Sequence, residues 1–325
     1  MKLVQMNAFG GPEVLETLEV TPPGIQADDE ILVRVRASGI NFFELLMRRD
    51  QYAVTPPLPA RFGVEIAGTA EAAGPQAGIA MGSRVAVPLF AIGRDGGYAE
   101  YVVAKAAAAV PVPEGVPFDA AVALQVQGLT ALHAVRRTAP AGRSVLVTAA
   151  GGGVGTLLIQ LLKQAGAGRV VALAGSEAKR QMALSLGADQ AVNHRDEGWL
   201  AHCRAAGPAA GFDLIYDFVG GDWTRQFTRL LAPAGVLLFG ALGRFTLATS
   251  EVSDLLDEAQ TIQGFALLPL LKTSDVGRDL AALFQRVVSK DLKPVIGGRF
   301  PLAHAARAHQ LLESRSSMGK VVLEP

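Results

Sequence analysis

The stretch SVLVTAAGGGVGTLLIQLLKQAGAGRVVALAGSEAK, residues 144–179, decides the fold because its pattern reads strand, glycine turn, helix, strand. An apolar run at 145–147 leads into four glycines within 151–155, and a helical pattern then precedes a second apolar run at 169–173. Ala150, Gly152 and Gly155 have the spacing of the dinucleotide fingerprint, with alanine in the first position. We therefore expect a dinucleotide to bind at this turn.

The glycines of this turn have separate physical roles. Gly152 allows the backbone to approach a pyrophosphate, and Gly155 allows the helix to pack closely on the strand. Free N–H groups and the positive end of the helix dipole would hold the phosphate charge. A tight turn without a ligand is the alternative, but four glycines in 151–155 lose more backbone entropy than a turn alone requires.

The end of the second strand predicts which dinucleotide binds. A site for NAD uses Asp or Glu there to bind the ribose hydroxyls. Here Leu173 is followed by Ala, Gly175 and Ser176, so no carboxylate is at the tip. Small residues leave room for a 2′-phosphate, and Lys179 and Arg180 follow to neutralise it. We therefore predict NADPH rather than NADH, although two basic residues can also belong to a solvated helix face.

Composition excludes several classes of protein. The 325 residues carry 30 basic and 30 acidic side chains, so no broad field favours nucleic acid or an anionic membrane surface. The N-terminus does not read as a signal peptide, and no apolar run is long enough to span a membrane. A single cysteine, Cys203, excludes an intrachain disulfide and fits a cytoplasmic protein.

The pattern along the chain predicts two domains. Short strands with turn signals up to about residue 115 predict a small antiparallel β-barrel, interrupted by a helix at 42–49. A long helix at 117–139 should lead into a doubly wound sheet of six parallel strands. The last 57 or so residues have no core of their own, so we expect them to return to the first domain. The expected domains are 1–120 with 269–325, and 121–268.

Several segments resemble the medium-chain dehydrogenase/reductase superfamily over essentially the whole chain. They are SGINFFELLMR (38–48), FGVEIAGTAEAAG (62–74), GGYAEYVV (96–103), GLTALHAV (128–135), VLVTAAGGGVG (145–155), NHR (193–195), FDLIYDFVGG (212–221) and FPLAHAARAHQLLESRSSMGKVVL (300–323). The zinc-independent branch of NADPH:quinone oxidoreductases, related to zeta-crystallin, is the most similar. The resemblance implies an α/β fold with a GroES-like β-barrel catalytic domain and a Rossmann domain.

The chain departs from the zinc enzymes of this superfamily at the metal site. Asn41 stands where they have Cys, and Val64 stands where they have His in a Gly-His-Glu motif. A catalytic zinc needs three N, S or O side chains and an open position. The resemblance therefore implies a protein without a metal site.

The resemblance also implies two catalytic residues, Asn41 and Tyr52. Hydride transfer to a quinone or enone leaves an oxyanion, and fixed donors beside it lower the barrier. Asn41 carries an amide donor at the former ligand position, and Tyr52 matches a Tyr beside the nicotinamide. An N-cap role for Asn41 on helix 42–49 is equally supported by residue type, and Tyr52 could be an ordinary loop aromatic. Leu46 replaces a Tyr of some relatives, which makes the expected pocket more apolar.

Further cofactor contacts follow from the same resemblance. Thr130 matches a residue that faces the nicotinamide, although its hydroxyl could instead bond its own helix backbone. Lys179, His194 and Arg315 match the residues around the 2′-phosphate. The remaining expected contacts are Gly152, Gly153, Val154, Gly155, Gly175, Ser176, Gly240, Ala241, Leu242 and Phe265.

The predicted activity is hydride transfer from NADPH to a quinone or an α,β-unsaturated carbonyl. Two alternatives remain open at this point: an enoyl-thioester reductase, for which Arg48, Arg49 and Arg61 are possible carrier-phosphate ligands, and a non-catalytic NADPH-binding protein. The resemblance implies a homodimer that pairs through the last strand of the nucleotide domain, residues 261–265, and neither nucleic acid nor membrane is expected as a partner.

Overall fold

A computed structural model describes all residues, 1–325, and the chain divides into two compact units. One unit consists of residues 1–129 together with 271–325, and the other consists of residues 130–270. The second unit is thus inserted in the chain of the first. Its boundaries lie at 129 and 270, rather than at the expected 120 and 268. None of the helices combines the length and the apolar character needed to cross a membrane.

The unit of residues 130–270 is built on six parallel strands. The strands are β9 (Ser144–Val147), β10 (Arg169–Leu173), β11 (Gln190–Val192), β12 (Phe212–Asp217), β13 (Leu231–Phe239) and β14 (Thr261–Gly264). Their order in the sheet is β11-β10-β9-β12-β13-β14, and every pairing is parallel. The chain therefore winds outward from β9 in both directions, which confirms the doubly wound sheet.

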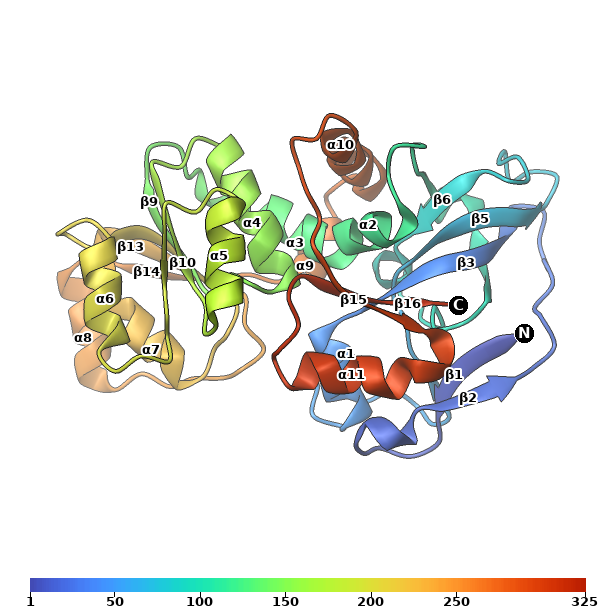
Figure 1. Ribbon diagram of the computed structural model, residues 1–325, viewed down its shortest axis with the longest axis horizontal. Helices are drawn as coiled ribbons and strands as arrows, with labels where there is room; N and C mark the ends of the chain where they lie inside the picture. The colour runs from blue at the N-terminus through green and yellow to red at the C-terminus, as the bar shows by residue number, and fades with distance from the viewer. The chain divides into compact units, whose positions relative to one another are not determined.

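Seven helices connect or flank these strands: α3 (Leu129–Thr138), α4 (Gly153–Gln164), α5 (Glu177–Ser185), α6 (Trp199–Ala206), α7 (Asp222–Thr228), α8 (Thr249–Asp257) and α9 (Leu267–Leu271). Helices α4 and α5 lie against β10 (Figure 1). Leu146, Val171, Ile215 and Leu237 from four neighbouring strands are fully buried between the layers. Burial of a sheet on both faces explains its continuous apolar runs.

The other unit contains two sheets. A three-stranded sheet has the order β2-β1-β4, and a seven-stranded sheet has the order β15-β16-β3-β5-β6-β8, with β7 paired to β3. The strands are β1 (Lys2–Met6), β2 (Glu16–Glu19), β3 (Glu30–Ile40), β4 (Ala60–Arg61), β5 (Ile66–Ala73), β6 (Arg84–Val87), β7 (Tyr101–Lys105), β8 (Val110–Pro111), β15 (Ile296–Pro301) and β16 (Lys320–Glu324). The α-helices are α1 (Phe42–Arg48), α2 (Phe118–Ala123), α10 (Val276–Val288) and α11 (Ala305–Glu313). Short 3-10 turns are η1 (Pro12–Val14), η2 (Leu89–Ile92), η3 (Ala106–Ala108) and η5 (Leu302–His304).

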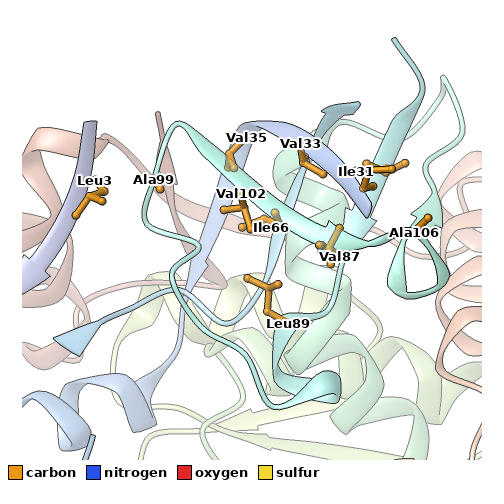
Figure 2. Close-up of a cluster of buried hydrophobic side chains, with 12 residues drawn as sticks. Leu3, Ile31, Val33, Val35, Ile66, Val87, Leu89, Ala99, Val102 and Ala106 are labelled. Atoms are coloured by element: carbon orange, nitrogen blue, oxygen red, sulfur yellow. The ribbon is translucent and has the colours of Figure 1, made fainter. Parts of the chain in front are cut away.

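Alternating strand residues form the core of this unit. Ile31, Val33 and Val35 of β3 point to one side and meet Ile66 of β5 and Val102 of β7 (Figure 2). All five side chains are buried because residues two apart on a strand share one face. Arg34 and Arg36, which alternate with these valines along β3, lie on the exposed face, as the alternation predicts.

The C-terminal segment returns to the first unit, as the sequence predicts. Strand β16 pairs antiparallel with β3, where Val322 faces Gly39 and Leu323 faces Ser38. Helix α11 lies alongside α1 and the β15–β16 pair (Figure 1). Helix α11 and strand β16, which both lie more than 250 residues after α1 in the sequence, therefore contact α1 and its N-cap residue.

The single helix predicted at 117–139 is wrong in its middle. A π-helical turn, η4 (Leu124–Gly128), separates α2 from α3. The Val126 N–H donates to Glu65 Oε2 at 2.8 Å, so a distant carboxylate draws the backbone out of regular helical geometry. Such π-turns inside helices are frequent at functional sites.

Candidate functional site

The glycine turn has the geometry of a phosphate cradle. Gly152 caps α4 in extended conformation, and a Cβ added there would meet only the Ala149 carbonyl oxygen, at 3.2 Å. A Cβ on Gly155 would lie 2.7 Å from Ala150 Cα, so only glycine allows α4 to start this close to β9. A backbone without a side chain at Gly152 and close helix–strand packing at Gly155 are the two features that a bound pyrophosphate requires.

The expected cofactor residues of this unit gather at one edge of the sheet. Because the six strands are parallel, the segments that follow them meet at their carboxyl ends, where ligands of such sheets bind. Gly240 is held against Phe218 and Phe265, whose rings are 6.2 Å apart. Residues at these strand ends are Gly152, Gly153, Val154, Gly175, Ser176, His194, Gly240, Ala241, Leu242 and Phe265.

Basic side chains surround the end of β10. A Cβ on Gly175 would lie 2.7 Å from His194 Nε2 and 2.8 Å from Arg195 Nε. Ser176 caps α5, and its hydroxyl accepts the Lys179 N–H at 3.4 Å. Burial and the positive charge of Arg195 lower the pKa of Lys179. The positive charges of Lys179 and Arg195 repel each other, and an anion bound beside them would relieve this repulsion.

Four basic residues were expected near this phosphate, and the structure sorts them differently. His194 lies at Gly175, and the Lys179 side chain lies at Gly151 in the glycine turn, close enough to Arg195 for their charges to interact. Arg180 forms an ion pair with Glu177 on the same helix. Arg315 belongs to the other compact unit. Arg195 was missed, although it follows His194 directly and both side chains approach Gly175.

Asn41 lies at the centre of a buried polar cluster in the unit of residues 1–129 and 271–325. It is the N-cap residue of α1, with its backbone N–H donating to Glu44 Oε2 at 2.8 Å. Its side-chain Nδ2 donates to Glu65 Oε1 at 2.8 Å and to Glu44 Oε2 at 3.3 Å. Its Oδ1 accepts from Lys320 Nζ at 2.9 Å. The N-cap role is thus present, and the longer bond to Glu44 is the weaker of the two amide donations.

Lys320 forms a buried ion pair with Glu65, and neither side chain has any exposed surface. A Cβ on Gly39 would lie 2.6 Å from Lys320 Cε, so the glycine of β3 makes room for the pair. Sequence reasoning did not identify Lys320. The signal available was a lysine directly before the apolar run Val321–Leu323 of the final strand, where a buried charge must find a partner.

The residues at the former metal position do not fit a metal ion. Asn41 Oδ1 and the Glu65 carboxylate already bind the Lys320 ammonium, and Val64 offers no donor atom in its side chain. A divalent cation at this position would be repelled by the buried ammonium of Lys320. No group of three or more His, Cys, Asp or Glu side chains that could hold a metal ion occurs in the chain.

Glu44 connects this cluster to Tyr98. Its Oε1 accepts the Gly63 N–H at 2.8 Å, and complete burial raises the pKa of Glu44 to about 7 despite that bond, the Asn41 N–H and the Lys320 charge. Burial also raises the pKa of Tyr98 well above its usual value, and the charge of Glu44 and a hydrogen bond to it add to that shift. The cluster thus holds two buried carboxyl groups, Glu44 and Glu65, and the ammonium of Lys320.

Two further expected residues lie apart from this cluster. Tyr52 is half-buried in the loop after α1, with its ring 5.7 Å from that of Phe43. Thr130 is buried near the start of α3, directly after the π-turn that Glu65 engages.

Comparison with known proteins gives consistent similarities over the whole chain. A family described as alcohol dehydrogenase GroES-like domain matches residues 27–114, and one described as zinc-binding dehydrogenase matches residues 186–323. A quinone oxidoreductase of Pseudomonas aeruginosa is 33% identical over 335 residues, covering 100% of this chain and 99% of that protein. Escherichia coli quinone oxidoreductase complexed with NADPH is 28% identical, with a TM-score of 0.89 and 100% of both chains covered. An NAD-dependent alcohol dehydrogenase is 32% identical, with a TM-score of 0.88 and 100% of both chains covered.

Proposed function

Because the chain belongs to the quinone oxidoreductase branch of the medium-chain dehydrogenase/reductase superfamily, we propose that it reduces quinones or α,β-unsaturated carbonyls with NADPH and without zinc. The observation that carries this proposal is the pair of cations, Lys179 and Arg195, beside a strand end that has no carboxylate. That arrangement favours a 2′-phosphate over free ribose hydroxyls.

The structural relatives alone do not choose the cofactor. One of them is a quinone oxidoreductase with NADPH bound, and another is described as an NAD-dependent alcohol dehydrogenase. The residues of this chain favour the first, since no carboxylate follows β10 and Lys179 and Arg195 supply positive charge there, with the His194 ring at Gly175. Gly152 and Gly155 would hold the pyrophosphate. Bound NADPH supplies the hydride, and the remaining requirements fall to the protein.

Asn41 and Tyr52 are the proposed catalytic residues. Reduction of a conjugated carbonyl creates negative charge on oxygen, and a fixed N–H or O–H donor aimed at that oxygen stabilises it. Asn41 would give the amide proton that makes the 3.3 Å contact with Glu44, while the 2.8 Å bond to Glu65 keeps the amide in place. The half-buried Tyr52 would donate its hydroxyl or pack on the substrate ring.

The ion pairs formed by the arginines weaken the enoyl-thioester alternative. Arg48 is fully buried and forms an ion pair with Glu313, and Arg49 pairs with the same carboxylate at 3.0 Å. Of the three arginines considered for a carrier phosphate, only Arg61 remains without these ties, and one surface arginine is a weak basis for such a site. A non-catalytic NADPH-binding protein is the second alternative, and turnover separates it from an enzyme.

The test is NADPH consumption with 9,10-phenanthrenequinone, 1,4-benzoquinone and a simple enone, followed by absorbance. We expect turnover with at least one of these acceptors and only slow turnover with NADH. Tight NADPH binding without turnover on any acceptor would favour the binding protein, and turnover restricted to an acyl thioester would favour the alternative enzyme.

We also propose a homodimer formed through β14, the strand at the outer edge of the six-stranded sheet. An edge strand leaves N–H and C=O groups available for another chain, and Leu256 of the preceding helix is 76% exposed. Light scattering behind a sizing column measures the assembly, and a monomeric mass at micromolar concentration would contradict it. The cytoplasmic location stays a prediction from the single cysteine.

A further inference from the structure

The side-chain amide of Asn41, the N-cap residue of α1, can lie in two orientations that exchange its oxygen and its nitrogen. The two orientations fill nearly the same space, so packing alone does not select one of them. One orientation presents an N–H to a substrate oxygen, whereas the other presents a carbonyl oxygen, which repels the negative charge that forms in the reduction. Donation to the substrate therefore requires that the protein fix the orientation of this amide.

Lys320 of β16 contacts the end of the amide at which the orientations differ. Its Nζ donates to Asn41 Oδ1 at 2.9 Å. An ammonium has donors and no acceptor, so only the oxygen of the amide can bind it. The Lys320 side chain has no exposed surface and Asn41 is 3% exposed, so this charge-assisted hydrogen bond is shielded from solvent.

Glu65 selects the same orientation from the other end of the amide. Its Oε1 accepts from Asn41 Nδ2 at 2.8 Å and also binds the Lys320 ammonium. Its Oε2 accepts the Val126 N–H at 2.8 Å, which keeps the carboxylate from turning. A group with donors only and a group with acceptors only thus face opposite ends of one amide.

We propose that Lys320 is a positioning residue for the reduction, which holds Asn41 Oδ1 so that the side-chain N–H groups point to Glu65 and to the substrate oxygen. The inference rests on the proposed function, because that function makes Asn41 the donor. Glu65 holds one N–H at 2.8 Å, and the second, whose contact with Glu44 is longer at 3.3 Å, is left for the substrate. The ammonium at Oδ1 also polarises the amide, which makes its N–H a stronger donor.

Two variants separate the orientation of the amide from the charge of the ion pair. Lys320→Met removes the ammonium but also leaves the Glu65 carboxylate uncompensated, so its effect on kcat has two causes. Glu65→Gln combined with Lys320→Met leaves no buried charge at this position and should fold stably. In this double variant the Val126 N–H binds the new amide oxygen, so the new NH₂ group faces Asn41 and draws the Asn41 oxygen towards it. The 2.8 Å contact outweighs the 3.3 Å contact with Glu44, and the Asn41 amide reverses.

Steady-state kinetics with 9,10-phenanthrenequinone give the first readout. Lys320→Met and the double variant should each lower kcat about tenfold or more, the typical effect of losing a hydrogen bond to a charged group, with the KM for NADPH unchanged. Adding both substitutions to Asn41→Ala should cause no further loss, because Lys320 acts through this amide. A kcat that recovers in the double variant, or a further loss in the Asn41→Ala background, would overturn the proposal.

Leu323→Ala is the matched control, because Leu323 is fully buried in the same strand and belongs to an apolar cluster. It lies three residues after Lys320 and so faces the opposite side of β16. The substitution should reduce stability and leave kcat unchanged. A loss of kcat equal to that of Lys320→Met would overturn the proposal in favour of a packing role for this strand.

An NMR measurement keeps this inference separate from the proposed function. In the wild type, Asn41 Nδ2 and the Asn41 backbone N both donate to Glu44 Oε2, so a nuclear Overhauser effect should connect their protons. It should persist in Leu323→Ala and weaken strongly in the double variant, with the side-chain signal assigned by its loss in Asn41→Ala. An unchanged effect in the double variant overturns the positioning role even if the enzyme is active. A weakened effect in a protein that reduces no acceptor upholds the role of Lys320 in orienting Asn41 and refutes the proposed function.

Discussion

Replacing Lys320 by methionine should destabilise the unit of residues 1–129 and 271–325 by about 3–5 kcal/mol, the usual range for removing one partner of a buried ion pair. We use the range for buried pairs because the side chains of Lys320 and Glu65 are both 0% exposed. Without the ammonium, Glu65 keeps only the N–H donors of Val126 and Asn41, at 2.8 Å each. These bonds do not neutralise its charge.

The double variant distinguishes a lost charge partner from a lost side chain. Glu65→Gln alone leaves an unpaired ammonium and should be similarly unfavourable, whereas Glu65→Gln with Lys320→Met leaves no buried charge at this position. We expect the double variant to be more stable than the sum of the two single effects by about 3 kcal/mol or more, since contacting buried residues couple strongly. Lys105→Met is the control, because its ion pair with Asp29 is half exposed and should matter little.

Amide hydrogen exchange in β3 and β16 is the appropriate assay. Tryptophan fluorescence would report the other unit, because Trp199 and Trp223 both lie within residues 130–270. Exchange of the Ile40 and Val321 amides measures opening of the sheet at the ion pair itself. Single variants that change the opening free energy by less than about 1 kcal/mol, or a double variant equal to the sum, would refute the view that Glu65 and Lys320 depend on each other for charge compensation.

Three further predictions concern pH, packing and metal. Burial lowers the pKa of His309 from 6.5 to about 3, so the unfolded chain binds its proton more readily, and the resulting stability is complete above pH 6.5 and lost as pH falls towards 3. At about pH 5 the stability lost through His309 amounts to about 2 kcal/mol. In urea titrations, His309→Gln should remove this part of the pH dependence. An identical dependence of stability on pH in both proteins would contradict the prediction. Gly155→Ala should weaken NADPH binding and lower the melting temperature, because its Cβ would lie 2.7 Å from Ala150 Cα, whereas Gly142→Ala, whose Cβ would meet nothing within 4 Å, should show only the smaller effect of its positive φ of 72°. Added chelator should leave NADPH consumption unchanged, and a loss of activity that zinc restores would show that a metal is required.

The large features of the fold follow from local sequence. The glycine turn at 151–155, the strand and helix alternation after it, and the lack of a core in the last residues predict the doubly wound sheet and the C-terminal return, and the structure confirms both. The alternative considered for Asn41, an N-cap at the start of helix 42–49, follows from its residue type and place, and Asn41 is the N-cap residue of α1. Each of these depends on residues close together in the chain.

The missed features depend on partners far apart in the chain. The π-turn at Leu124–Gly128 forms because Glu65, 61 positions earlier, takes the Val126 N–H. Lys320 and Glu65 are 255 positions apart, and Arg48 and His309 are 261 apart. No periodicity in the sequence indicates such pairs.

The most direct test of the account is the ratio of dissociation constants for NADH and NADPH, measured by titration calorimetry on four proteins. We expect the wild type to bind NADPH far more tightly, and Lys179→Ala or Arg195→Ala to reduce that preference by about tenfold or more, the typical effect of losing one charge-assisted hydrogen bond. Arg180→Ala, which breaks only the ion pair with Glu177, should leave the ratio unchanged. A wild type that binds NADH as tightly as NADPH, or basic-residue variants that lose both cofactors equally, would contradict the assignment of NADPH to this site.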